Sequence, residues 1–247
     1  MERSDEFAPA ARWSALTSLR PQRARVQLAA TRGEVSLAAS VWKPTTVETR
    51  QGLPAVVIVH QWSILGGQAS LMHGMARELN ERGLTAVTFD HRGVGGSSGT
   101  RTIRGISEVE DVEAVLEWAH TKLERDLVLL GSSAGAPIAG SALDRFAFVK
   151  GYVAIGYVFG LLSSVLFSCH YDAIVKSSKP KLFIMGTKDE FTSPAQLQSM
   201  LDKMSSVKES HLVEGIGHFT LESEKYDGLM AELTRSFILK HCATHNE

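Results

Sequence analysis

Two segments of the chain match the pattern Gly-x-Ser-x-Gly, residues 95–99 and residues 131–135. This pattern is typical of a nucleophilic serine on a sharp turn between a strand and a helix, where the glycines relieve crowding. Residues 131–135 directly follow the apolar run 127–130 and lead into small residues that let a helix pack closely on a sheet. Residues 95–99 are followed by a stretch that does not open a helix. We therefore predict that Ser133 is a nucleophile and that Ser97 is not.

A serine hydroxyl becomes a good nucleophile only when a neighbouring base accepts its proton and a carboxylate orients that base. Where the Gly-x-Ser-x-Gly turn occurs, the three residues follow the chain order serine, acid, histidine. We predict His218 as the base, because it lies in a glycine-containing loop just past the last predicted strand. Asp189 is the predicted acid, since it follows the end of another predicted strand. Asp172 is the alternative acid, although it lies further from a strand end.

Acyl transfer also needs two backbone N–H groups directed at the oxyanion that develops on the substrate. One of them comes from the residue after the nucleophile, which is Ala134. The other comes from the loop after an earlier strand, where we predict the N–H of Trp62, with Gln61 as the adjacent alternative. The competing interpretation of this loop is an ordinary turn in which His60 makes a local hydrogen bond.

The elements that position these residues follow from the apolar pattern. Apolar and polar residues alternate along residues 26–42, and a turn interrupts this alternation, which predicts an antiparallel hairpin. Short continuous apolar runs then alternate with helical patterns, which is typical of a parallel sheet covered by helices. The predicted strands are residues 55–59, 85–89, 127–130, 152–155, 181–185 and 211–213, and the predicted helices are residues 71–82, 108–121 and about 229–239.

The sequence thus predicts the α/β class, with about eight mostly parallel strands and helices on both faces of the sheet. Ligands of such sheets bind at the carboxyl ends of the strands. No repeat or linker divides residues 1–247, so we expect a single domain. Residues 1–24 are expected to form a poorly ordered N-terminal extension.

In order and spacing, five segments resemble the α/β-hydrolase superfamily: residues 56–67, 89–97, 131–135, 186–189 and 217–218. The resemblance is to small capless serine hydrolases whose oxyanion loop runs His-Pro-x-x-x-x-Gly-Gly, with Gln61 in place of the proline here. It implies an α/β-hydrolase fold and a Ser133, Asp189 and His218 triad. It also implies a structural role for the loop that contains Ser97.

The connection between the predicted strands that end at residue 155 and begin at residue 181 is too short for a cap domain. We expect it to form a short lip. Together with Gln61, its aromatic residues Tyr157 and Phe159 are predicted to line the substrate pocket. The alternative is a helix that packs its apolar face on the core.

Composition excludes several classes of function. The chain has 247 residues, 44% of them hydrophobic and 21% charged, with a formal net charge of -1. This balance lacks the basic footprint of a nucleic-acid binder. The only cysteines, Cys169 and Cys242, lack zinc-ligand spacing, and no P-loop or His-Glu-x-x-His motif occurs. We therefore expect no metal, no cofactor and a reducing, cytoplasmic location.

Residues 151–169 carry no charge and are about as long as a membrane-spanning helix. Their glycines and serines favour a buried strand followed by a loop, so we expect no stable membrane insertion. Taken together, the residues predict a serine hydrolase that cleaves a small ester, thioester or related acyl compound. The alternative is a ligand-binding or interaction protein on the same fold with little or no turnover. The sequence leaves the oligomeric state open.

Overall fold

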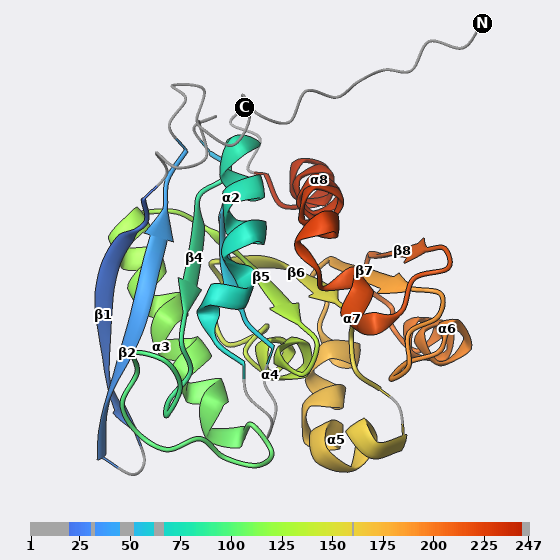
Figure 1. Ribbon diagram of the computed structural model, residues 1–247, viewed down its shortest axis with the longest axis horizontal. Helices are drawn as coiled ribbons and strands as arrows, with labels where there is room; N and C mark the ends of the chain where they lie inside the picture. The colour runs from blue at the N-terminus through green and yellow to red at the C-terminus, as the bar shows by residue number, and fades with distance from the viewer. Residues whose placement is uncertain (1–19, 31–32, 45–51, 62–66, 160, 244–247) are drawn as a thin grey trace, which may run out of the picture.

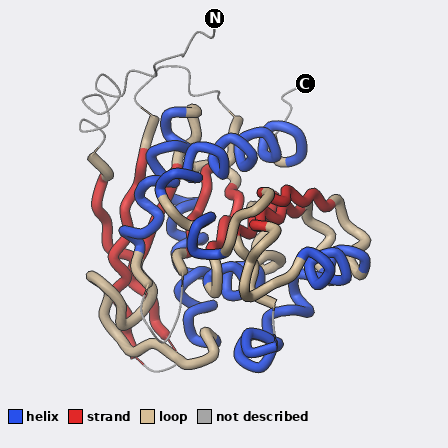
Figure 2. The backbone as a smooth tube through the Cα atoms, turned by 45° about the vertical axis from the view of Figure 1, so that its right-hand side comes forward, coloured by secondary structure: helices blue, strands red, loops and turns tan. Residues whose placement is uncertain are grey.

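The computed structural model describes residues 20–30, 33–44, 52–61, 67–159 and 161–243. An eight-stranded sheet runs through the middle of the molecule, in the order β1-β2-β4-β3-β5-β6-β7-β8 (Figures 1 and 2). The strands are β1 (Gln22–Ala30), β2 (Gly33–Trp42), β3 (Ala55–Val59), β4 (Ala86–Phe89), β5 (Leu127–Ser132), β6 (Val149–Ile155), β7 (Lys181–Gly186) and β8 (Lys208–Val213).

Strands β3 to β8 are parallel, whereas β2 is antiparallel to both β1 and β4. The predicted hairpin is confirmed, but β1 begins at Gln22, so residues 22–24 of the expected extension belong to the sheet. All five residues of β3 are buried, because the strand lies inside the sheet with helices on both of its faces. The predicted α/β class with mostly parallel strands is therefore confirmed.

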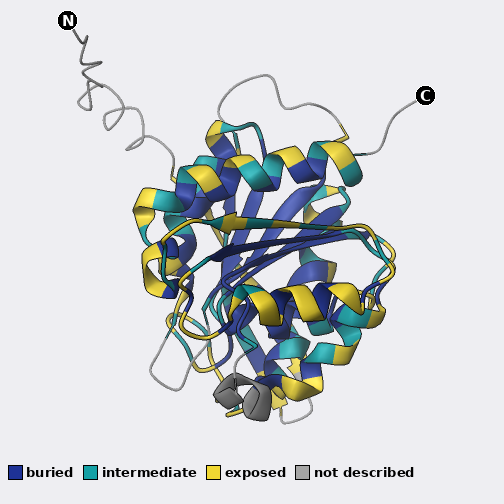
Figure 3. Cartoon of the chain, turned by 90° about the vertical axis from the view of Figure 1, so that its right-hand side faces the viewer, coloured by how far each residue is buried: buried dark blue, intermediate teal, exposed yellow. Residues whose placement is uncertain are grey.

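Helices cover both faces of the sheet (Figure 3). In chain order they are η1 (Ala69–Met72), α2 (His73–Glu81), α3 (Ile106–Leu123), α4 (Gly135–Ser141), α5 (Leu161–Lys176), α6 (Pro194–Asp202), α7 (His218–Leu221) and α8 (Glu224–His241). Apolar residues of α2, α7 and α8 join one core cluster, and those of α3, α4, α5 and α6 join the cluster on the opposite face. Each face of the sheet thus has its own buried core.

The connection predicted as a lip is largely a helix, because α5 occupies residues 161–176. Gly140 of α4 allows this helix to approach closely, since a Cβ atom there would lie 2.3 Å from side-chain atoms of Ile174. The packing favours the alternative interpretation of this segment, a helix against the core. Within the part of the chain that the structure describes, no helix is long and apolar enough to cross a membrane.

Candidate active site

The backbone turns sharply between β5 and α4, and Ser133 lies at the turn with a φ of 51°. This conformation is uncommon for a residue other than glycine. Both glycines of the motif are required by close packing. A Cβ atom on Gly131 would lie 2.5 Å from the Cα of Ala136, and one on Gly135 would lie 2.1 Å from the carbonyl oxygen of His60. The turn leaves Ser133 partly exposed, between buried neighbours.

The side chains of Ser133, His218 and Asp189 form one hydrogen-bonded chain. The Ser133 hydroxyl lies 2.8 Å from Nε2 of His218, and Nδ1 of His218 lies 2.7 Å from Oδ2 of Asp189. An ionised carboxylate only accepts hydrogen bonds, so Nδ1 carries the proton and Nε2 is left to accept the serine proton. The other Asp189 oxygen accepts the N–H groups of Phe191 and Thr192, both at 2.9 Å. The acid is therefore fixed by its own loop.

His218 begins the short helix α7, so the prediction of a loop at this residue was wrong. A neighbouring carboxylate orders the segment, because the His218 N–H donates to Oε2 of Glu190 at 2.8 Å. Gly217 and Gly156 make room for it. A Cβ on Gly217 would lie 2.7 Å from Oε1 of Glu190, and one on Gly156 would lie 3.0 Å from Cε1 of His218. His218 is thus held by Glu190 at its backbone N–H, and its ring lies against Gly156.

Burial alone would lower the pKa of His218. The hydrogen bond with Asp189 and the negative charges of Glu222, Asp189 and Glu190 outweigh it, so the pKa is raised above its ordinary value. A base of this kind is neutral above its pKa and is stabilised by these carboxylates once it takes up a proton. That is the behaviour general-base catalysis requires.

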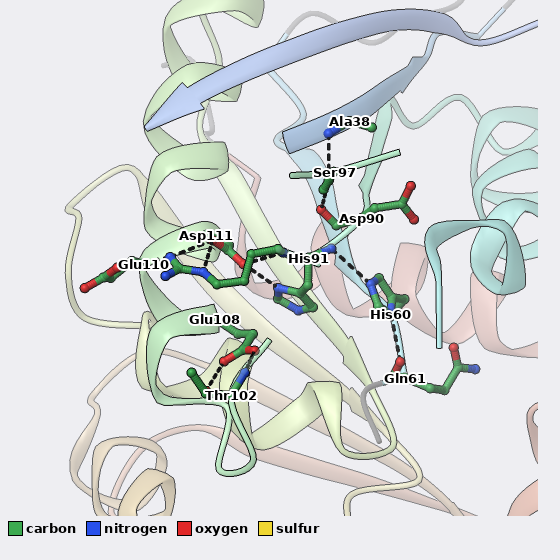
Figure 4. A network of polar contacts seen from close by, with 11 residues as sticks. Ala38, His60, Gln61, Asp90, His91, Ser97, Thr102, Glu108, Glu110 and Asp111 are labelled. Carbon is green, nitrogen blue, oxygen red and sulfur yellow. Dashed lines mark hydrogen bonds and ion pairs between the residues drawn. The ribbon is translucent and has the colours of Figure 1, made fainter. Parts of the chain in front are cut away.

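The alternative residues lie elsewhere. Asp172 is exposed on α5 and pairs with Lys176 at 2.7 Å. Ser97 belongs to the loop after β4, where its hydroxyl donates to the carbonyl of Asp90 at 2.6 Å and accepts the N–H of Ala38 at 2.9 Å (Figure 4). These contacts tie the loop to β2, so Ser97 has a structural role.

His60 holds the start of the loop after β3 in place (Figure 4). Nδ1 of His60 lies 2.7 Å from the carbonyl oxygen of Gln61, and Nε2 accepts the N–H of His91 at 3.2 Å. Burial, followed by the proximity of His91, lowers the pKa of His60 to about 3, so the ring is neutral and structural. His60 therefore makes the local hydrogen bond that the competing interpretation predicts.

Of the two predicted oxyanion donors, only Ala134 is described. It precedes the first turn of α4, where backbone N–H groups have no partner within a helix. Trp62 lies outside the described residues. Gln61, the alternative, is described, and its side chain lowers the pKa of Glu222. Among the described residues, Oε1 of Gln61 is buried without a hydrogen-bond partner.

The predicted pocket residues differ in their surroundings. Tyr157 is only 3% exposed and packs edge-on against Phe183 at 6.0 Å between ring centroids. Its side chain therefore serves the core and does not face an open lip. Phe159 is half-buried and stacks on Tyr171 at 4.9 Å. The role of Gln61, Tyr157 and Phe159 in substrate binding stays a prediction.

Three residues beside His218 were missed by the sequence analysis. Phe191 and Phe219 are 37% and 70% exposed, and their rings lie 4.6 Å and 5.4 Å from the imidazole. Glu222 accepts the Ser132 hydroxyl at 2.6 Å. The only sequence signal was position, since Phe219 follows His218 directly and Glu222 lies four residues on. Within the described segments, no group of three or more His, Cys, Asp or Glu residues is placed to hold a metal ion.

Comparisons with known proteins agree with this fold. A family model described as X-Pro dipeptidyl-peptidase (S15 family) matches residues 33–142, less than half of the chain. An uncharacterized protein of Rickettsia prowazekii is 24% identical over 181 residues, covering 69% of this chain and 74% of that protein. An uncharacterized protein of Mycobacterium tuberculosis is 27% identical over 190 residues, covering 70% of this chain and 66% of that one.

Solved structures are similar over most of the chain. A serine hydrolase without lid from Xanthomonas campestris is 23% identical with a TM-score of 0.69, covering 92% of this chain and 99% of that one. An α/β serine hydrolase homologue from Coxiella burnetii is 25% identical with a TM-score of 0.67, covering 88% and 96%. An esterase from Pyrococcus furiosus is 18% identical with a TM-score of 0.70, covering 98% of both chains. The fold is shared with these proteins, at low sequence identity.

Proposed function

We propose that this chain, which has the fold of the α/β-hydrolase superfamily, is a serine hydrolase that cleaves a small ester, thioester or related acyl compound. The observation that carries the proposal is the continuous hydrogen-bonded chain from Ser133 through His218 to Asp189. Its free end is the hydroxyl of Ser133, a partly exposed residue, and its inner end is a carboxylate fixed by two backbone N–H groups. This is the arrangement that turns a serine into a nucleophile.

In the proposed reaction, the Ser133 oxygen attacks the acyl carbon while its proton passes to Nε2 of His218. Asp189 stabilises the imidazolium that results. The tetrahedral oxyanion accepts the N–H of Ala134 and a second N–H, for which Trp62 is our prediction. The intermediate then expels the alcohol or thiol, which takes the proton from His218, and leaves an acyl group on Ser133. Water, deprotonated by His218, releases the acid and restores the serine.

The proposal is tested by reaction with a fluorophosphonate probe followed by mass spectrometry of the labelled peptide. We expect one adduct, on Ser133, that is lost in Ser133→Ala and kept in Ser97→Ala. An adduct on another serine would contradict the assignment. Failure of the folded wild-type chain to react would favour a ligand-binding protein on this fold.

A cytoplasmic location and a small-molecule acyl substrate belong to the same proposal. The cysteines support the first part, because Cys169 and Cys242 are both free and reducing compartments keep thiols in that state. The exposed aromatic rings of Phe191 and Phe219 support the second, since they offer apolar surface beside the reacting atoms.

A further inference from the structure

A second carboxylate, that of Glu222, lies at the same centre as Asp189. Glu222 follows His218 by four residues, and its N–H donates to the His218 carbonyl at 3.2 Å, which closes the turn of α7. The turn places both side chains on one face, so Oε2 of Glu222 lies 3.9 Å from Nε2 of His218. Nε2 is the atom that contacts the Ser133 hydroxyl.

The Glu222 side chain also joins the two other segments of the site. Its Oε1 accepts the hydroxyl of Ser132, the residue before the nucleophile, at 2.6 Å. The Gln61 side chain, at the start of the loop after β3, also lowers the pKa of this carboxylate. One side chain thus acts on the nucleophile turn, on Gln61 and on the helix that carries the base. The carboxylate is 11% exposed and is held by the Ser132 hydroxyl.

Among the described residues, the charged groups that raise the pKa of His218 are all carboxylates. Asp189 and Glu190 approach from the connection between β7 and α6, and Glu222 approaches from the histidine's own helix. When His218 takes up the serine proton at Nε2, the imidazolium lies between Asp189 on the Nδ1 side and Glu222 on the Nε2 side. At 3.9 Å, Glu222 is too far to accept this proton in a normal hydrogen bond, so it acts through its charge.

We propose that Glu222 is a positioning residue of the centre, one that stabilises protonated His218 from the Nε2 side and keeps the nucleophile turn in place through Ser132. This inference rests on the proposed function. The pKa of Glu222 is raised, because burial and the charge of Asp189 outweigh the hydrogen bond from Ser132, the charge of His218 and the Gln61 side chain, which favour the ionised form.

The test measures the titration of the His218 imidazole by NMR and, in parallel, the pH dependence of kcat/KM on an activated ester. Glu222→Gln keeps the size and the acceptor oxygen but removes the charge. We expect the pKa of His218 to fall by about one unit, since an opposite charge at this distance shifts a pKa by one unit or more. The acidic limb of kcat/KM should move to lower pH by the same amount, with a fall in kcat larger than the change in KM.

Glu224→Gln is the matched control, because Glu224 is an exposed glutamate two residues further along and does not act on His218. It should leave the titration of His218 unchanged. Equal His218 pKa values in Glu222→Gln, Glu224→Gln and the wild type would overturn the inference. If Glu222→Gln does not fold, Glu222→Asp withdraws the charge by one methylene and should give a smaller downward shift. An unchanged pKa in that variant would overturn the inference too.

The NMR titration needs no substrate. A chain that fails to react with the fluorophosphonate probe but shows the shifted titration would contradict the proposed function and not the electrostatic coupling. A chain that reacts but shows no shift would contradict the role of Glu222 alone.

Discussion

Asp189 and Asp172 show how surroundings separate two residues of the same type. Asp189 is buried, accepts two backbone N–H groups and contacts the imidazole of His218. Asp172 is 71% exposed in its side chain and pairs with a lysine one turn along α5. An exposed pair of this kind contributes little to stability and nothing to the site.

Replacement of each aspartate by asparagine should therefore give opposite results on p-nitrophenyl acetate. Asp189→Asn should lower kcat by about 10⁴-fold, the loss known for a triad carboxylate, because the amide favours the wrong tautomer of the histidine. Asp172→Asn should leave kcat unchanged. If turnover survived in Asp189→Asn and vanished in Asp172→Asn, the acid would have to be sought on α5.

Residues such as Glu222, Phe191 and Phe219 lay beyond what the sequence could predict. Motif order indicated Ser133, Asp189 and His218, because that order follows from the fold. Glu222 belongs to no motif, and its contact with Ser132 joins positions 90 residues apart. Such contacts arise only when distant segments pack, and a single sequence holds no signal for that packing.

At the scale of elements, the packing of α2 against α8 contains a buried carboxylate. Asp227, in the first turn of α8, lies over Gly74 of α2, where a Cβ atom would come within 1.9 Å of its Oδ2. Burial, together with the charges of Glu224 and Glu78, raises the pKa of Asp227 to about 7. The two helices thus pack around an acid that is costly to ionise.

This packing makes stability depend on pH in a defined direction. Between pH 4 and 7, the folded chain binds a proton at Asp227 that the unfolded chain has released, so the free energy of unfolding falls as pH rises through this window. Asp227→Asn removes the penalty. We expect the variant to be more stable than the wild type by a few kcal/mol at pH 8 and by almost nothing near pH 4.

Urea unfolding at several pH values measures this difference. Asp202→Asn is the matched control, because Asp202 is exposed at the end of α6, and it should show no such trend. Equal stability of Asp227→Asn and the wild type at pH 8 would show that Asp227 ionises without cost.

Helix α6 illustrates which elements escaped the sequence analysis. A signal was present, since Ser193 and Gln196 form a capping box in which each side chain hydrogen-bonds to the other's backbone N–H. Only a short apolar pattern follows this box along the chain. The helix has nine residues, and its buried residues Leu197, Met200 and Leu201 make a single helical repeat, whereas α3 repeats its buried apolar residues over 18 residues. Strands inside the sheet were predicted well because burial on both faces leaves continuous apolar runs.

At the scale of the whole molecule, the parallel strands bring the site together at one edge of the sheet. Ser133 follows β5, Gly156 follows β6, Asp189 follows β7 and His218 comes after β8. The connection between β6 and β7 holds α5, which packs against α4 in the part of the chain that the structure describes.

Because α5 packs against α4, we expect the site to accept short acyl chains and to need no activating interface. We expect kcat/KM for soluble p-nitrophenyl esters to rise by about fourfold per methylene from acetate, until the apolar contacts are filled. This factor corresponds to the free energy of about 0.8 kcal/mol that each buried CH₂ contributes. Emulsified long-chain esters should give no extra activity. A marked preference for emulsions would mean that a segment of the chain moves as a lid.

The order in which the chain is made has a consequence for when this chemistry appears. Ser133 and His218 are 85 positions apart, and His218 belongs to a helix close to the C-terminal end of the described chain. Contacts between such distant residues form late, because the entropy of closing a long loop is lost before any contact compensates for it. A growing chain therefore carries its nucleophile long before its base. The proposed hydrolytic activity is thus withheld from the nascent polypeptide until His218 has been made and has folded against the nucleophile turn.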